Sequence, residues 1–239
     1  MIDPFNRDIN YLRVSITDRC NLRCIYCMPK EGLSLLGHDD ILRYEEILRV
    51  IRETVKMGIS KVRITGGEPL ARRGVIDFIR SLADIEGLED VSLTTNGILL
   101  EKYATQLADA GMKRINISLD SLNSKRYSSI TRGGDLDTVL RGIDAVQKLG
   151  FSPIKINVVV VNGLNDDEID DFARMSVEKP YQIRFIELMP MGRALIHNLG
   201  SYLSNDVIKK RIRRHHILKA LEKKRRKIDG PAQLYRIDE

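Results

Sequence analysis

The residues most able to do chemistry are three cysteines that lie within eight positions of one another. They are Cys20, Cys24 and Cys27, and the 239-residue chain contains no other cysteine. Three thiolates can hold three irons of a 4Fe–4S cluster and leave the fourth iron open to an outside ligand. A disulfide is disfavoured, because three is an odd number and we expect a cytosolic chain. Zinc held by three cysteines and a histidine is the alternative, but the nearest histidine, His38, lies eleven residues beyond Cys27.

The elements that must position these cysteines alternate between strand-like and helix-like runs, which is typical of repeated βα units around a parallel sheet. The expected strands are Tyr11–Thr17, Lys61–Thr65, Val91–Thr95, Arg114–Leu119, Ile154–Val161 and Gln182–Leu188. The expected helices are Tyr44–Met57, Val75–Ala83, Glu101–Ala110, Leu136–Leu149 and Asp166–Ser176. Six strands predict an α/β fold, an open, partial βα barrel rather than a closed one of eight strands. The cysteines follow the first strand, at the carboxyl end of the barrel, where such folds build their sites.

One face of the expected sheet is polar in five strands, because alternate side chains of a strand point to opposite faces. The polar set is Arg13, Ser15, Thr17, Lys61, Arg63, Thr65, Ser92, Thr94, Asn96, Asn116, Ser118, Asp120, Lys155 and Asn157. Helices outside a barrel require an apolar outer face, so these rows must point inward. Burying them is costly unless a ligand occupies the lumen, and the cations among them favour an anion. Reversed faces, or half-exposed positions in an ordinary sheet, are the alternative.

The motifs resemble those of a known superfamily. Cysteines spaced by three and then two residues after a first barrel strand are similar to the radical SAM signature, where SAM is S-adenosylmethionine. Gly66-Gly67-Glu68-Pro69 resembles the SAM-binding stretch of that superfamily. From about residue 3 to about residue 193 the chain resembles the MoaA family, the GTP 3′,8-cyclases of molybdenum cofactor biosynthesis. The motifs that carry this narrower resemblance are Thr17-Asp18-Arg19-Cys20, Cys27-Met28-Pro29, Arg63 to Leu70, Thr94-Thr95-Asn96-Gly97 and Glu187-Leu188-Met189-Pro190.

The resemblance implies the cofactors, the reaction and the contacts. One 4Fe–4S cluster on the three cysteines and SAM are the implied cofactors. The implied lyase reaction cleaves SAM reductively to a 5′-deoxyadenosyl radical and cyclises GTP to (8S)-3′,8-cyclo-7,8-dihydroguanosine 5′-triphosphate. Positions similar to the family's SAM contacts are Tyr26, Gly67, Ser118 and Met189, and positions similar to its GTP contacts are Arg13, Arg63, Thr94 and Lys155, with Arg184 a further candidate. No side chain is expected to act as general acid or base in the first hydrogen abstraction. Implied partners are GTP, a one-electron donor of flavodoxin or ferredoxin type, and the next enzyme of the molybdopterin pathway.

The C-terminal part of the sequence departs from that family. MoaA proteins carry a second set of three cysteines for a second 4Fe–4S cluster, whereas no cysteine follows Cys27 here, so a second cluster is not expected. Residues 209–227 include eleven Lys or Arg and one acid and carry +10, while the whole chain carries +6, so the remainder is mildly acidic at −4. We expect residues 1–195 to form the barrel. Residues 196–239 are expected to form a basic, helical tail, an incomplete remnant of the family's C-terminal region.

Two other functions stay open at this point. One is a radical SAM enzyme that acts on another substrate, for example a peptide. The other is a non-catalytic iron–sulfur protein that binds RNA through the basic tail, although a basic run near a chain end is more commonly a solvated helix face. No apolar run approaches the roughly 20 residues that span a bilayer, and the N-terminus lacks the layout of a signal peptide. We therefore expect a cytoplasmic protein without membrane contact.

Overall fold

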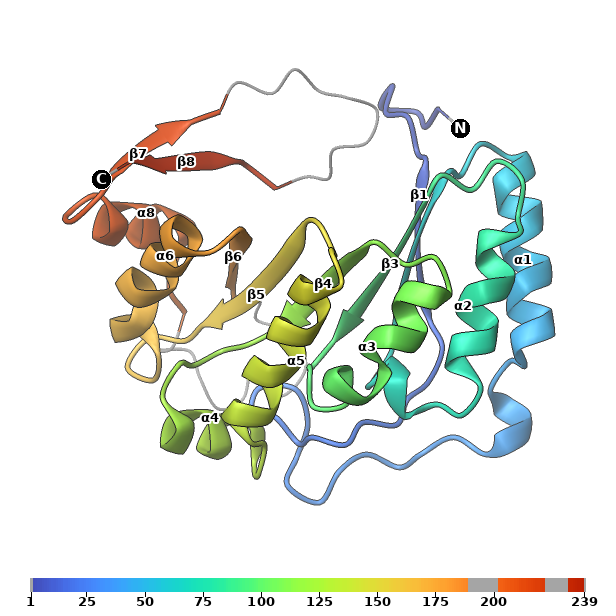
Figure 1. Ribbon diagram of the computed structural model, residues 1–239, viewed down its shortest axis with the longest axis horizontal. Helices are drawn as coiled ribbons and strands as arrows, with labels where there is room; N and C mark the ends of the chain where they lie inside the picture. The colour runs from blue at the N-terminus through green and yellow to red at the C-terminus, as the bar shows by residue number, and fades with distance from the viewer. Residues whose placement is uncertain (1, 189–201, 222–231, 239) are drawn as a thin grey trace.

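The computed structural model describes residues 2–188, 202–221 and 232–238 (Figure 1). Six parallel strands form one sheet in the order β1-β2-β3-β4-β5-β6. They are β1 Tyr11–Ser15, β2 Lys61–Thr65, β3 Asp90–Thr95, β4 Arg114–Ser118, β5 Ile154–Val160 and β6 Tyr181–Glu187. The helices are α1 Tyr44–Lys56, α2 Val75–Ala83, α3 Leu100–Asp109, α4 Ser124–Thr131, α5 Leu136–Lys148, α6 Ile169–Glu178 and α8 Asn205–Ile212. Sequential parallel strands joined by helices are the predicted open βα barrel.

The main core lies between the sheet and the helices that cover one of its faces (Figure 1). Ile64, Leu93, Ile117 and Ile156, one from each of four neighbouring strands, are fully buried there. Each such aliphatic side chain stabilises the fold by about 1.5–3 kcal/mol relative to exposure. A register slip of one residue would move these apolar side chains from the helix-covered face of the sheet to the opposite face. The apolar face therefore fixes the register and leaves the polar rows on the other face, as the sequence predicts.

Helix α4 is the element of the barrel that the sequence pattern did not reveal. Its eight residues include four serines or threonines and two cations, and they show no clear apolar stripe. Its start is nevertheless encoded, because the side chain of Asn123 accepts a hydrogen bond from the backbone N–H of Arg126 at 3.0 Å. Asparagine is among the strongest N-cap residues. The helix packs through Tyr127 and Ile130, both almost completely buried.

The C-terminal tail is not wholly helical, which corrects part of the prediction. Residues 205–212 form α8, but β7 Ile217–Ala220 and β8 Tyr235–Asp238 pair as antiparallel strands. In Figure 1 this pair lies at the top of the view, beside α8 and away from the loop that follows β1. Ile208 and Ile212 of α8 join the main core. The domain boundary predicted at residue 195 lies outside the described residues and stays a prediction.

None of the helices in the described part of the chain combines the length and the apolarity that crossing a bilayer requires.

Candidate functional site

The three cysteines lie on the loop between β1 and α1, at the carboxyl end of the sheet. The backbone N–H of Ile25 donates to the carbonyl oxygen of Ile130 in α4 at 2.9 Å. The guanidinium of Arg132, directly after α4, donates to the carbonyl oxygens of Arg23 at 2.9 Å and Met28 at 2.8 Å. These bonds hold the cysteine loop on both sides of its last two cysteines. Helix α4 therefore serves as the support of this loop.

The thiols of the loop lie close enough to affect one another electrostatically. Burial raises the pKa of Cys24 to about 12, and the nearby Asp120, Cys27 and Cys20 raise it in the same direction. Burial and Cys20 likewise raise the pKa of Cys27. A cationic metal centre removes this mutual repulsion, and thiolates are the ligands that iron–sulfur clusters take. Among the described residues, no group of three His, Cys, Asp or Glu side chains is placed to hold a single metal ion.

Two glycines bring the loop after β2 into backbone contact with the cysteine loop. The N–H of Gly67 donates to the carbonyl oxygen of Thr17 at 2.7 Å. A Cβ atom on Gly67 would lie 2.2 Å from the carbonyl oxygen of Arg19, and one on Gly66, at φ +152°, would lie 2.6 Å from that of Thr17. The packing of the chain against itself therefore requires both glycines. Contact between Gly67 and SAM stays a prediction.

Glu68, the next residue, ties together the loops that follow β2 and β3. Its fully buried carboxylate accepts from the N–H of Leu70 at 3.0 Å, the hydroxyl of Thr95 at 2.8 Å and the N–H of Asn96 at 2.7 Å. Burial raises the pKa of Glu68, and these hydrogen bonds oppose the rise. A buried carboxylate with three donors specifies one geometry of the two loops.

Tyr26, the predicted SAM contact between two cysteines, is anchored by its hydroxyl. That hydroxyl donates to Oδ2 of Asp120 at 2.5 Å, and the N–H of Val159 donates to Oδ1 at 2.8 Å. Burial raises the pKa of Asp120 to about 6. Ser118, at the end of β4, lies two residues before Asp120 and is half-buried. Met189 lies outside the described residues.

The predicted GTP contacts share the polar face of the sheet. Arg13 is the register partner of Arg63 between β1 and β2. Thr94 and Lys155 are both register partners of Asn116, which lies between them on β4. The structure thus brings all four predicted residues onto one face of the sheet.

Cations outnumber acids on that face. Burial and the neighbouring cations lower the pKa of Lys155 to about 8, and they also lower the pKa values of Arg63 and Arg184. The nearby carboxylate of Asp90 already pairs with Arg114 at 2.6 Å. The Nε of Arg63 is buried without a hydrogen-bond partner. Grouped, partly desolvated cations are costly without a counter-charge, so this face suits an anionic ligand.

Some contributors to the polar face were not predicted from the sequence, although strand parity could have found them. Arg114 and Asp90 lie two residues before Asn116 and Ser92, which places them on the polar rows. The ring of Tyr11 lies 5.2 Å from the guanidinium carbon of Arg63, a cation–π contact.

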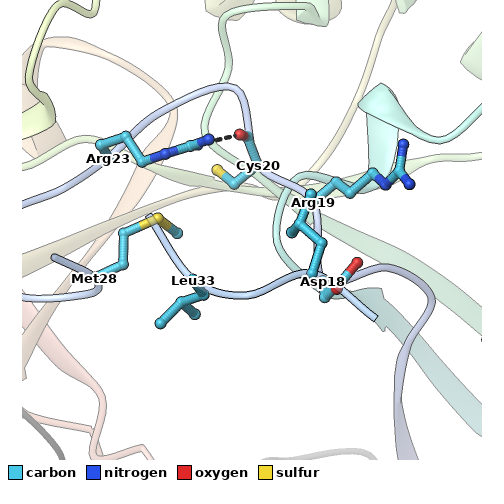
Figure 2. Close-up of a pocket in the computed structure, with 7 residues that line it drawn as sticks. Asp18, Arg19, Cys20, Arg23, Met28 and Leu33 are labelled. Atoms are coloured by element: carbon cyan, nitrogen blue, oxygen red, sulfur yellow. Dashed lines mark hydrogen bonds between the residues drawn. The ribbon is translucent and has the colours of Figure 1, made fainter. Parts of the chain in front are cut away.

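A pocket of about 240 Å³ opens beside the cysteine loop (Figure 2). The guanidinium of Arg23 donates to the carbonyl oxygen of Cys20 at 2.6 Å. Leu33 and Leu35, which also line the pocket, are 59% and 51% exposed. The lining residues are Asp18, Arg19, Cys20, Arg23, Met28, Leu33 and Leu35. The pocket gives access to the first cysteine from the molecular surface.

Comparison with known proteins agrees with this arrangement. The model of the radical SAM superfamily matches residues 14–176. Among solved structures, the chain is similar to SuiB from Streptococcus suis bound to the precursor peptide SuiA, with a TM-score of 0.65 and 16% identity over 86% of this chain and 44% of that one. It is also similar to TYW1 with a lysine–pyruvate adduct bound, with a TM-score of 0.60 and 15% identity over 89% and 76% of the two chains. These two likenesses concern the fold alone.

The open six-stranded barrel and the three-cysteine loop define a radical SAM protein, a class that takes a 4Fe–4S cluster and SAM as cofactors. The GTP 3′,8-cyclase of Alkaliphilus metalliredigens is 55% identical over 212 residues, 89% of this chain and 66% of that protein. That of Thermodesulfovibrio yellowstonii is 52% identical over 236 residues, 98% and 72% of the two. The chain belongs to the family of GTP 3′,8-cyclases, and it spans about two thirds of the length of these curated relatives.

Proposed function

We propose that this chain cleaves SAM reductively and cyclises GTP to (8S)-3′,8-cyclo-7,8-dihydroguanosine 5′-triphosphate, a step of molybdenum cofactor biosynthesis. The observation that carries the proposal is the cationic face of the sheet. Arg63, Lys155 and Arg184 are partly desolvated on this face, the charge of Arg63 lowers the pKa values of the other two, and the Nε of Arg63 is left without a partner. A nucleoside triphosphate supplies several negative charges, each of which can accept hydrogen bonds from these cations.

Cys20, Cys24 and Cys27 would hold the 4Fe–4S cluster. When bound, the cluster and SAM supply one-electron cleavage of the sulfonium, which yields methionine and a 5′-deoxyadenosyl radical. The side chains Tyr26 and Ser118, the backbone of Gly67, and Met189 beyond the described residues are the proposed SAM contacts. The Tyr26–Asp120 hydrogen bond fixes the cysteine loop relative to β5.

The residues of the polar face would orient GTP. Arg13 and Arg63 can each make paired, charge-assisted hydrogen bonds to phosphate oxygens, Lys155 adds a point charge, and Thr94 adds a hydroxyl. The work of this face is positioning and the exclusion of water, because the first hydrogen abstraction needs no side chain as acid or base.

We further propose partners and a location. A one-electron donor of flavodoxin or ferredoxin type would approach the cysteine loop from the side of the pocket at Cys20, where Leu33 and Leu35 are exposed. The product would pass to the next enzyme of the molybdopterin pathway in the cytoplasm. The cysteine content of the sequence supports one cluster on this chain.

The direct test is anaerobic. The chain is reconstituted with iron and sulfide, reduced, given SAM and GTP, and assayed for 5′-deoxyadenosine and cyclised nucleotide. Arg63→Met should abolish the nucleotide product, whereas Arg52→Met, a matched change of an exposed arginine on α1, should leave it. Deoxyadenosine with no nucleotide product from the unmodified chain would contradict the GTP assignment and favour another substrate. RNA binding that is sensitive to salt and is lost on deletion of residues 209–227 would instead favour a non-catalytic iron–sulfur protein that binds RNA through its basic tail.

A further inference from the structure

Two N–H groups reach the sulfur of Cys20. The backbone N–H of Leu22 lies 3.4 Å from Sγ, and the side-chain Nδ2 of Asn96 lies 3.8 Å from it. Among the described residues no comparable donor reaches the sulfurs of Cys24 and Cys27. Among the three cysteines, Cys20 therefore differs in one respect. Its sulfur is contacted by a side chain from another βα loop, that of Asn96 after β3.

The orientation of the Asn96 side chain is over-determined. Its Oδ1 accepts from the N–H of Ile98 at 3.1 Å, and its Nδ2 also donates to Oδ1 of Asn21 at 2.7 Å. Oxygen and nitrogen of an amide are often assigned from such partners. Here a backbone donor faces the oxygen and an amide oxygen faces the nitrogen, so the NH₂ group must point toward Cys20.

Buried Glu68 holds the backbone of Asn96 in place. Its Oε2 accepts from the N–H of Asn96 at 2.7 Å, while Oε1 accepts from the hydroxyl of Thr95 at 2.8 Å. The N–H of Gly67 in turn bonds the loop of Glu68 to the carbonyl oxygen of Thr17 in front of the cysteine loop. Three consecutive βα loops are thus connected, and the amide of Asn96 is held at the sulfur by this connection.

We propose that Asn96 is a positioning residue that raises the reduction potential of the cluster by donating its amide N–H to the sulfur of Cys20. Reduction adds negative charge that the cluster shares with its thiolate ligands. An N–H dipole aimed at such a sulfur stabilises the reduced form more than the oxidised form. The inference needs a cluster on the three cysteines but not the turnover of GTP, so the two proposals can fail separately.

The test is a potentiometric titration of the reconstituted chain, without SAM or GTP, followed by electron paramagnetic resonance. Asn96→Leu removes the donor at similar volume, and Asn96→Asp removes it but keeps an oxygen for the N–H of Ile98. Each substitution should lower the ratio of reduced to oxidised cluster at a fixed potential by roughly three- to tenfold, and Asn96→Asp should have the larger effect. That is a shift of about 30–60 mV to more negative potential for a one-electron couple. Asn21→Ala, the matched control, leaves the donor and should not lower the potential.

A purely structural role of Asn96 would give a different result. Wild-type potentials in both Asn96 variants would overturn the proposal, whatever their activity. Where neither variant takes up a cluster, the Asn21→Ala chain labelled with ¹⁵N in its asparagine side chains supplies the second test. A ¹⁵N coupling to the reduced cluster in pulsed spectra is then expected from Asn96, and its absence would overturn the proposal.

Discussion

Replacing Lys155 by methionine should weaken GTP binding and at the same time stabilise the empty protein. Lys155 lies on β5 with Arg184, Arg114 and Arg63 around it, and burial together with these cations lowers its pKa to about 8. A lysine whose pKa falls on folding binds fewer protons in the folded chain than in the unfolded one. Its charge therefore opposes folding below pH 8. Methionine has a similar length and carries no charge.

The expected magnitude follows from the contact that the ammonium would make. A hydrogen bond to a charged group contributes about 1.5–3 kcal/mol, so the dissociation constant of GTP should rise by about ten- to 150-fold at pH 7, at 1.36 kcal/mol per tenfold. With a pKa near 8, about 90% of the Lys155 side chains are protonated at pH 7. Bound phosphate raises this pKa again. Wild-type affinity should therefore fall by about tenfold per pH unit above pH 8, until the pKa of the complex is reached.

Anaerobic calorimetry of the cluster-loaded chain at pH 7, 8 and 9 measures the binding, and thermal unfolding without nucleotide measures the stability. Lys148→Met is the matched control, since Lys148 is exposed on α5 and pairs with Asp144 at 2.6 Å. The stability advantage of Lys155→Met should shrink between about pH 8 and pH 10.5. In that range the wild-type lysine is neutral in the folded chain and still protonated in the unfolded chain, so its charge no longer opposes folding. Normal GTP affinity together with a lowered melting temperature in Lys155→Met would refute the reasoning.

Three further changes test how the cysteine loop is supported. In chemical denaturation, Gly67→Ala should destabilise the chain by about 1–3 kcal/mol, because the added Cβ would lie 2.2 Å from a backbone oxygen. Gly37→Ala is the control and should be near neutral, because its Cβ would meet only the side-chain carboxylate of Asp40. Arg132→Ala should speed the loss of iron measured against a chelator, since two loop carbonyls lose their donor, and an unchanged rate would contradict the role of α4. Cys24→Ser should lower bound iron and the visible absorbance of the cluster to near background, and full iron content would place the cluster elsewhere.

The fold was largely predictable because strand parity is a strong signal. The apolar rows that include Ile64 and Ile117 are fully buried against helices. A slip of one residue would expose all of them. The polar rows with Arg63 and Lys155 could therefore be assigned to the other face from the alternation of residue types alone, and the register places the predicted GTP contacts together.

The parts that sequence reasoning missed depend on contacts between distant segments. Helix α4 carries a weak pattern of its own and is stabilised by Tyr127 in the core and by bonds to the cysteine loop. The backbone contact that requires a glycine at position 67 was also missed, because a glycine that a ligand needs and a glycine that a backbone contact needs look alike in sequence. Strand pairing of residues 217–220 with 235–238 is long-range, and the basic composition of the tail conceals it.

The proposed activity requires that this chain generate a radical from SAM and direct it to the ribose of GTP. The most direct measurement is mass spectrometry of the 5′-deoxyadenosine formed anaerobically from SAM and GTP that carries deuterium at the 3′ carbon. We predict deuterium in the deoxyadenosine together with a cyclised nucleotide that has lost it. Deoxyadenosine that forms at the same rate without GTP and contains no deuterium would contradict the claim.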